Sequence, residues 1–409
     1  MFYPQKHVSK MPIEIHINTS ISKIPSSKWN LLVNPNDPFT THEFLSALEE
    51  SNSVCIQTGW QPLHISIQDQ NTILAAMPLY LKNHSYGEYI FDWSWAQACQ
   101  QAGIPYYPKL CSAIPFTPAS GERLLFNRQE FSDGYTYLFK GLLAAMNQTQ
   151  AQSCHVLFCS QPEFLEGTNW DFVQRLTSQY HWINPFSSKD PAKFEDWLDL
   201  FTRKGRKDIR QERTKAQKSI SKIYWKQGHE LQKHHIDKIY HFYMDTCSRK
   251  WGSPYLESSF FDRLQDTLAH LTWVCFAEID DQIVASSLFF QRGSHLYGRY
   301  WGCEESVKFL HFELCYHQPI ELCLQMGWKR FEAGAQGNHK LKRGLLAQPT
   351  YSLHHLSYQP LHHGVYQAVQ QENSKLIDIL HTNMMHAPIK SEFRESWSKN
   401  LTLLQNMFS

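Results

Sequence analysis

The sequence contains no apolar run that approaches the ~18–20 residues needed to cross a membrane, although 42% of its 409 residues are hydrophobic. Its start, Met1 to His7, has no apolar stretch after its charged residues, so we expect no secretory signal. The ten cysteines include no C-x-x-C pair, and several lie in apolar runs such as Val156 to Cys159. Reduced cysteines packed in a core are typical of a cytoplasmic protein without disulfides or zinc.

Three common catalytic signatures are also absent: the G-x-S-x-G elbow, the G-x-x-x-x-G-K-[ST] phosphate loop and H-E-x-x-H. The 22 histidines include adjacent pairs at 234–235, 354–355 and 362–363, whose two side chains point apart on a helix or a strand. No metal-ligand spacing is recognisable, so the sequence predicts no metal site. The glycine-rich stretch 334–340 is either a turn at a strand end or a loop that lets the backbone approach a ligand.

Charge is balanced overall but not locally. The formal charge is +1, yet residues 203–226 hold ten basic and two acidic residues, so this segment carries +8 and the rest −7. Apolar residues at Ile209, Ala216 and Ile220 predict one packed face of a helix over 203–221, followed by a strand from Lys222. The basic residues turn outward. The candidate contacts to phosphates are Arg203, Arg206, Lys207 and Arg210. A solvated helix face is the alternative interpretation.

An internal repeat appears at a constant offset of 210 residues. Each copy predicts a hairpin: 64–68 and 73–82 flank one short polar turn, and 274–277 and 283–292 flank the other. A third strand (294–301), a helix from about 305 to 326 and a strand (330–333) follow the second hairpin. Pro319 should kink or restart that helix. A strand around 86–92, a helix near 135–146 and a strand at 154–159 follow the first. This order predicts an α+β fold built twice.

Four long stretches carry a resemblance to a known family. They are Asn34-Pro35-x-x-Pro38-Phe39 with His42-Glu43-Phe44-Leu45; Thr58-Gly59-Trp60-Gln61-Pro62 with 78–93; Tyr106-Tyr107-Pro108-Lys109-Leu110 with Pro115-Phe116-Thr117-Pro118; and His311-Phe312-Glu313 with 330–344. Together they resemble the bacterial FemAB-like predicted N-acyltransferases, often labelled peptidoglycan biosynthesis or recognition proteins. The resemblance implies an α+β fold of two tandem GNAT-like halves, over 12–185 and 186–385, with a C-terminal tail at 386–409.

The resemblance also implies transfer of an acyl or aminoacyl group to an amine, with a peptidoglycan precursor as candidate acceptor. The co-substrate would be aminoacyl-tRNA or acyl-CoA, and no tightly bound cofactor is expected. GNAT enzymes hold the pyrophosphate of coenzyme A on an R/Q-x-x-G-x-G/A loop. The nearest stretch here is 299–305, where Glu304 and Glu305 stand at the expected helix start and would repel a pyrophosphate. Aminoacyl-tRNA is therefore favoured as donor.

Candidate site residues come from these stretches. The hypothesised general base is one of three carboxylates at predicted strand ends, Glu88, Asp92 and Glu332. Candidates for binding anionic groups are Lys109, Lys340 and Arg343, and candidates for the walls of a cleft are Tyr86, Trp93, Tyr107 and Tyr300. Gln336, in the fourth stretch, is a further substrate-binding candidate.

Each of these residues also has a structural interpretation, as a cap, a surface charge or a core aromatic. Two other function classes stay open as well: a non-catalytic module that recognises a cell-wall precursor, and an RNA-binding protein that uses residues 203–226.

Overall fold

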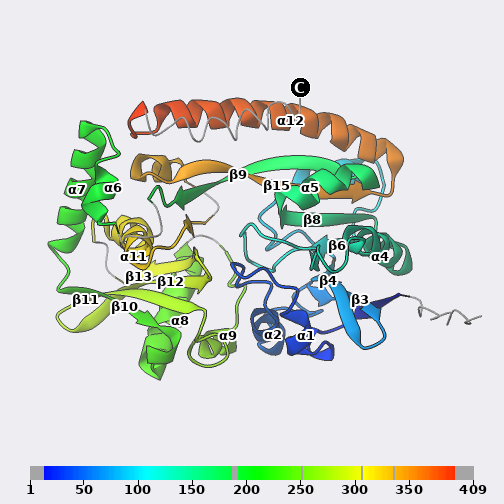
Figure 1. The fold of residues 1–409 in the computed structure, drawn as a ribbon, viewed down its shortest axis with the longest axis horizontal. Coiled ribbons are helices and arrows are strands. Elements are labelled where there is room, and N and C mark those ends of the chain that lie inside the picture. Colours follow the sequence, from blue (N-terminus) through cyan, green and yellow to red (C-terminus); the bar gives the residue numbers. More distant parts are fainter. Residues whose placement is uncertain (1–12, 187–191, 250–251, 305–306, 335–336, 392–409) are drawn as a thin grey trace, which may run out of the picture.

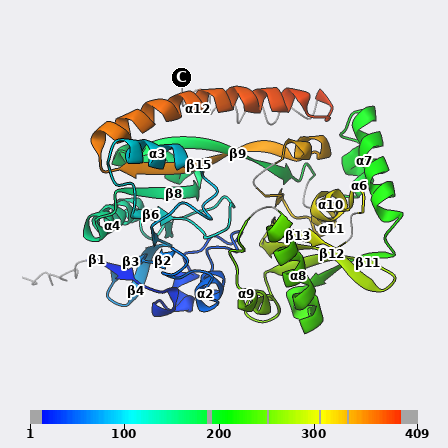
Figure 2. The same ribbon diagram turned by 180° about the vertical axis from the view of Figure 1, so that it is seen from behind.

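The fold was obtained as a computed structural model that describes residues 13–186, 192–249, 252–304, 307–334 and 337–391. Figures 1 and 2 show two groups of elements side by side, one from the first half of the chain and one from the second, beneath a long helix, α12 (Gln359–His386). No helix in the described part of the chain is both long and apolar enough to cross a membrane.

The first half alternates short helices with strands. Its strands are β1 (Glu14–Asn18), β2 (Gln61–Pro62), β3 (His64–Asp69), β4 (Thr72–Met77), β5 (Tyr80–Lys82), β6 (Lys109–Ser112), β7 (Leu125–Phe126), β8 (Ser153–Cys159) and β9 (Val173–Ile183). Its helices are α1 (Ser26–Trp29), α2 (His42–Glu50), α3 (Trp93–Gln101), α4 (Gly134–Thr149) and α5 (Gln161–Glu166).

The second half continues in the same mixed manner. Its strands are β10 (Lys222–Gln227), β11 (Thr272–Ile279), β12 (Gln282–Arg292), β13 (His295–Cys303), β14 (Arg330–Glu332) and β15 (Leu346–Leu356). Its helices before α12 are α6 (Phe194–Leu198), α7 (Arg203–Gln217), α8 (Lys233–Arg249), α9 (Ser258–Asp262), α10 (Leu310–Phe312) and α11 (Gln318–Met326).

The internal repeat is present in the hydrogen-bond register of the two hairpins. Ile67 pairs with Ala75 in β3–β4, and Ala277 pairs with Ala285 in β11–β12, so both partners are displaced by 210 residues. The register of each hairpin then shifts at the next residue, Gln68 in one and Glu278 in the other. A register shift at the same position supports a true repeat over a chance similarity of two hairpins.

The two halves exchange their last strands. An eleven-stranded sheet has the order β10-β11-β12-β13-β14-β9-β15-β8-β6-β5-β2. The first-half strand β9 pairs with β14, and the second-half strand β15 pairs with β8. The two exchanged strands also pair with each other over nine residue pairs, Leu346↔His181 to His354↔Val173. The halves therefore share one continuous sheet (Figure 1), and a site at their junction is built on rigid strands.

Three sequence predictions of local structure need correction. The strand predicted around 86–92 is a loop, because Gly87 (φ 81) and Tyr89 (φ 61) take left-handed conformations that a strand excludes. The helix predicted over 203–221 ends at Gln217, and a turn leads to β10. The helix predicted from about 305 begins at Leu310, and a five-residue π-helical turn (Glu313–His317) precedes α11. Pro319 in the first turn of α11 explains the altered hydrogen-bond register, since it donates no backbone N–H.

The predicted C-terminal tail lies mostly outside the described residues. Its described part continues from α12 and packs against the start of α7. The backbone N–H of Thr202 donates to the carbonyl of Pro388 at 2.9 Å, and Phe201 and Ile389 form an isolated β-bridge.

Candidate functional site

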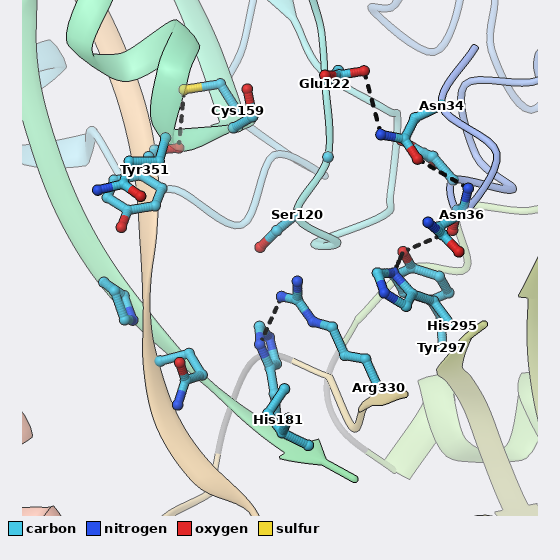
Figure 3. A pocket seen from close by; sticks show the side chains of 17 residues that line it. Asn34, Asn36, Ser120, Glu122, Cys159, His181, His295, Tyr297, Arg330 and Tyr351 are labelled. Carbon is cyan, nitrogen blue, oxygen red and sulfur yellow. Dashed lines mark hydrogen bonds between the residues drawn. The ribbon is translucent and has the colours of Figure 1, made fainter. Parts of the chain in front are cut away.

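A cavity of about 450 Å³ lies where the two halves meet, beside the exchanged strands. Its wall includes side chains from the first half, from the second half and from β9 and β15 (Figure 3). The lining residues that matter below are Asn34, Ser120, His181, His295, Tyr297 and Arg330.

A carboxylate–imidazole–guanidinium cluster, which we call the cavity triad, lies at this wall: His181 and Arg330 line the cavity, and the buried Glu332 contacts them without lining it. Strand pairing brings its members together, because His181 of β9 stands opposite Glu332 of β14. Arg330 precedes Glu332 by two residues, so both side chains point to the same face of the strand. Arg330 forms an ion pair with Glu332 at 2.8 Å, and His181 Nε2 lies 3.6 Å from the Glu332 carboxylate.

The protonation states of the triad follow from its contacts. A guanidinium always donates, and Arg330 donates to His181 Nδ1 at 2.8 Å, so the imidazole carries its proton on Nε2. Burial and the charge of Arg330 hold the pKa of His181 well below its usual value, which keeps the ring neutral. Burial raises the pKa of Glu332 above its usual value although Arg330 opposes that shift. Glu332 is therefore a carboxyl group whose pKa is moved toward neutrality beside a cavity.

Two polar groups of the cavity wall are buried without a hydrogen-bond partner in the described part of the protein. They are the hydroxyl of Ser120 and Nε of Arg330. Figure 3 shows the Ser120 side chain and the Arg330 guanidinium directed toward the same space. The backbone N–H of Ser120 donates to Glu332 at 3.4 Å, which links the first-half loop to the triad. Since unsatisfied buried donors are costly, such groups are candidates for binding a ligand.

Most of the first-half candidates lie in a different place, a closed network that we call the lysine cluster: Lys82, Lys109, Glu88 and Asp92. The Lys109 ammonium donates to Asp92 at 2.5 Å, to Glu88 at 2.8 Å and to the Ser85 hydroxyl at 2.7 Å. Lys82 lies 3.7 Å from Glu88, with its ammonium 3.3 Å from the centre of the Trp60 ring. All four charged residues are at most 4% exposed.

Burial and the opposite charges of neighbouring groups compete in setting the pKa values of the lysine cluster, and burial prevails at Glu88, whose pKa is raised. Burial alone would raise the pKa of Asp92, but Lys109 outweighs it and lowers this pKa to about 2. Burial would lower the pKa of Lys109, yet Glu88 and Asp92 raise it above its usual value. Burial lowers the pKa of Lys82 to about 8, against the attraction of Glu88. The cluster thus satisfies most of its own charges, as a structural ion network does.

The aromatic candidates of the first half surround the lysine cluster. Tyr107 shares a hydrogen bond of 2.8 Å with Ser85, and the rings of Tyr86 and Trp93 pack edge to face at 5.1 Å. Tyr86 and Trp93 are exposed rather than part of the central cavity. Tyr300 packs against Tyr243 in the second half, with ring centres 5.1 Å apart, and does not line that cavity either.

The remaining second-half candidates lie close to α7. Lys340 donates to the carbonyl of Gly334 at 2.7 Å, and burial lowers its pKa to about 8. Arg343 pairs with Glu212 of α7 at 2.7 Å, with its guanidinium 3.4 Å from the centre of the Phe312 ring. Arg343 therefore helps to hold α7 in place. Gln336 lies outside the described residues.

The four phosphate-contact candidates of α7 line one groove of about 580 Å³. Two of them have acidic partners: Arg206 lies 3.7 Å from Asp199, and Arg210 pairs with Glu195. A third basic residue of the segment, Arg213, turns inward to pair with the fully buried Glu313 at 3.0 Å. The local positive charge is thus lower than the sequence alone indicates.

Of the cavity triad, the sequence predicted Glu332 as a site residue but not His181 or Arg330. Arg330 stands in the fourth stretch, and its i, i+2 spacing from Glu332 on a predicted strand was a usable signal. His181 and Ser120 carried no such signal, because strand exchange and a loop bring them to the site.

The chain matches the family model described as FemAB-like, peptidoglycan biosynthesis/recognition, over residues 20–391. Comparison with curated proteins gave no match. Among solved structures, FemX is similar with a TM-score of 0.53 and 10% identity, over 84% of this chain and 98% of FemX. A conserved protein of unknown function from Bacteroides thetaiotaomicron has a TM-score of 0.50 and 9% identity, over 83% of this chain and 99% of its own.

A tandem GNAT protein from the clavulanic acid biosynthesis pathway has a TM-score of 0.43 and 7% identity, over 84% of this chain and 98% of its own. At such identities a likeness concerns the fold alone. The mixed strands and helices and the repeated hairpin confirm the predicted α+β fold built twice, and the match to FemX is a likeness of that fold. The family model spans nearly the whole chain, and the protein therefore belongs to the FemAB-like family.

Proposed function

We propose that this protein is an N-acyltransferase or aminoacyltransferase that acts on an amine of a peptidoglycan precursor in the central cavity. Family membership supports the substrate class. The observation that carries the chemistry is the cavity triad, a buried carboxyl group with a raised pKa beside two donors that have no partner in the described structure.

Acyl transfer to an amine first needs a neutral nitrogen. An alkyl amine with a pKa near ~10.4 is only on the order of 0.1% neutral at pH 7, so a base is valuable. Glu332 is the candidate that fits best, because burial brings its pKa closer to neutral pH and the cavity lies beside it. His181 cannot take the proton at Nδ1, which already accepts from Arg330.

The reaction also develops negative charge on the carbonyl oxygen. The amine nitrogen forms a bond to the carbonyl carbon, the bond from that carbon to the donor's oxygen or sulfur breaks, and the leaving group takes up a proton. Arg330 and the Ser120 hydroxyl are oriented to donate to the oxygen during this step. Positioning both substrates in one cavity adds an effect as large as ~7–11 kcal/mol, which explains why a conspicuous catalytic motif is not needed.

The proposal is tested by incubating the protein with labelled aminoacyl-tRNA or acyl-CoA and a panel of amines, including muropeptides. We expect product from the wild type and a ~10²–10⁴-fold lower rate from Glu332→Gln. Glu130→Gln, an exposed carboxyl far from the triad in the sequence, is the matched control and should retain the full rate. Muropeptide binding without turnover under all conditions would instead support a non-catalytic recognition module.

For the donor, we propose that the phosphates of aminoacyl-tRNA contact the α7 groove. Arg203 and Lys207 line this groove, and no ion pair is found for either within the described residues. If four contacts to single-stranded RNA form, log affinity should fall with log salt at a slope near ~−2.8. A flat salt response in a tRNA-binding titration would exclude this role for α7. Salt-sensitive RNA binding without any transfer would point to an RNA-binding protein.

A further inference from the structure

The fold brings one histidine from each of two adjacent pairs to the same aspartate. We propose that Asp171, His355 and His362 form a binding site for a divalent transition-metal ion of the zinc type, away from the central cavity. The sequence predicted no metal site because the two histidines of each pair point apart. Contacts between histidines of different pairs are not visible in the sequence.

The three residues come from separate elements that converge at one edge of the molecule. Asp171 stands just before β9 in a left-handed conformation (φ 58), His355 is the penultimate residue of β15, and His362 lies in the first turn of α12. The pairing of His354 with Val173 sets β15 beside the start of β9, so strand exchange is what closes this cluster.

The ligand atoms are close enough for one ion. One nitrogen of each imidazole and one carboxylate oxygen all lie within 4.8 Å of one another, and His362 Nε2 is 3.7 Å from Asp171 Oδ1. A tetrahedral zinc ion with ligand distances of about 2.0–2.2 Å requires separations near ~3.4 Å. The ligand atoms must therefore move closer on binding, and Asp171 and His355 are the two ligands that are not buried.

The hydrogen bond that each imidazole makes determines which of its two nitrogens can face a metal ion. His355 Nδ1 donates to the carbonyl of Asp171 at 3.0 Å, which leaves the Nε2 lone pair for a metal, as an outer hydrogen bond commonly does for histidine ligands. His362 Nδ1 accepts from the backbone N–H of Leu356 at a long 3.3 Å. The proton on Nε2 must leave before this atom can bind a metal; on Nδ1 it would face the N–H of Leu356, so this hydrogen bond breaks when the ion binds.

The donor set selects the metal. Two imidazoles and one carboxylate suit zinc, cobalt or nickel, whereas magnesium and calcium prefer oxygen ligands throughout. The Asp171 side chain is 71% exposed, which leaves a path for the ion and a position for water.

A bound ion would join the exchanged strand β15 and helix α12 to the first half. Because the site exists only when these elements are folded together, binding stabilises the native state by mass action. The proposed site is therefore a structural metal site, and metal binding can be measured without an activity assay.

The experiment measures Zn²⁺ binding to metal-free full-length protein by calorimetry, together with the thermal unfolding temperature. We expect one ion per chain and a higher unfolding temperature with Zn²⁺ in the wild type. His355→Ala should weaken binding by more than the ~10–100-fold typical of losing an outer-shell partner. Asp171→Asn is a milder second variant, because asparagine also tolerates the left-handed conformation. His363→Ala is the matched control; its exposed ring bonds to Gln367 and should be dispensable.

Co²⁺ gives an independent reading through the visible absorption of a tetrahedral complex, expected in the wild type and in His363→Ala but not in His355→Ala. The proposal is overturned if the wild type binds no Zn²⁺ at concentrations up to roughly a hundred micromolar. It is equally overturned if His355→Ala and Asp171→Asn bind Zn²⁺ as tightly as His363→Ala does, since binding then resides in other histidines.

Discussion

The lysine cluster and the cavity triad use the same chemical groups in opposite ways. Lys109 donates its ammonium protons to two carboxylates and a hydroxyl, and no residue of the lysine cluster lines the central cavity. Arg330 engages Glu332 and His181 but keeps Nε without a hydrogen-bond partner in the described structure, and it lines a cavity. The lysine cluster also leaves two acceptor atoms without a hydrogen-bond partner, Glu88 Oε1 and Asp92 Oδ1, but it pairs both carboxylates with lysines, which points to a structural role. A donor without a partner beside a cavity points to a ligand.

The largest change in stability is expected for Lys109→Met, which leaves Glu88 and Asp92 buried without their main counter-charge. Removing one partner of a buried ion pair costs ~3–5 kcal/mol, so the free energy of unfolding should fall by about that amount. Urea denaturation measures it. Lys140→Met, at an exposed position of α4, should change the free energy by less than ~0.5 kcal/mol. Equal stability of the two variants would contradict a structural role for the cluster.

In the cavity triad, Arg330→Met should lower the rate, and because it also leaves the buried Glu332 without its ion pair, the free energy of unfolding should be measured beside the rate. Losing one donor to the developing oxyanion lowers kcat by ~10²–10³-fold, equivalent to ~2.7–4 kcal/mol in the barrier. Steady-state kinetics with the donor and amine that give turnover measure this. Arg330→Lys keeps the charge but loses the fork geometry, so it should recover only part of the rate. Full activity in Arg330→Met would remove Arg330 from the mechanism.

The two regions should also differ in acid. The pKa of Asp92 in the folded protein, about 2, lies below its ordinary value of 3.8. Its carboxylate therefore stabilises the fold above about pH 4, and this contribution, on the order of 2 kcal/mol, is lost as the pH falls through about 2. Glu332 behaves oppositely, because its raised pKa makes protonation favour the folded state. Urea titrations between pH 5 and pH 2 should show a flatter decline in Asp92→Asn than in the wild type; an unchanged decline would contradict this assignment.

The smallest change is expected in α7, where Arg210 is ion-paired and Lys207 has no ion pair among the described residues. Lys207→Gln should reduce the salt slope of tRNA binding by ~0.7, the value of one phosphate contact. Arg210→Gln should reduce it by less, because Arg210 already pairs with Glu195. Binding titrations over a range of salt concentrations measure both slopes. A larger loss from Arg210→Gln would show that its ion pair opens on binding.

Local patterns predicted the repeated hairpins, the basic helix and the strand that follows it. Alternation and turn residues are contained within ten or twenty positions, so they are visible in the sequence. The strand expected around 86–92 was wrong for a tertiary reason. Glu88 and Asp92 turn inward to Lys109, and the backbone takes left-handed turns to allow it. A local pattern cannot reveal such a partner.

The three candidate carboxylates also differ only in the folded protein. Glu88, Asp92 and Glu332 were equivalent in the sequence, as acids at the ends of expected strands. Only the fold separates them, by giving two of them a buried lysine and placing the third beside a cavity, a neutral histidine and an arginine. Burial raises the pKa of both Glu88 and Glu332, whereas in Asp92 the charge of Lys109 outweighs burial and lowers the pKa, so the adjacent cavity rather than the pKa sets Glu332 apart from Glu88.

The sequence by itself determined the family, the α+β class and the 210-residue repeat, because these rest on motifs and on short-range periodicity. The tertiary structure alone decided that β9 and β15 change places between the halves. That exchange brings His181 to Glu332 and Asp171 to His355, and pairings between residues more than 150 positions apart arise from sheet register, which no local pattern encodes.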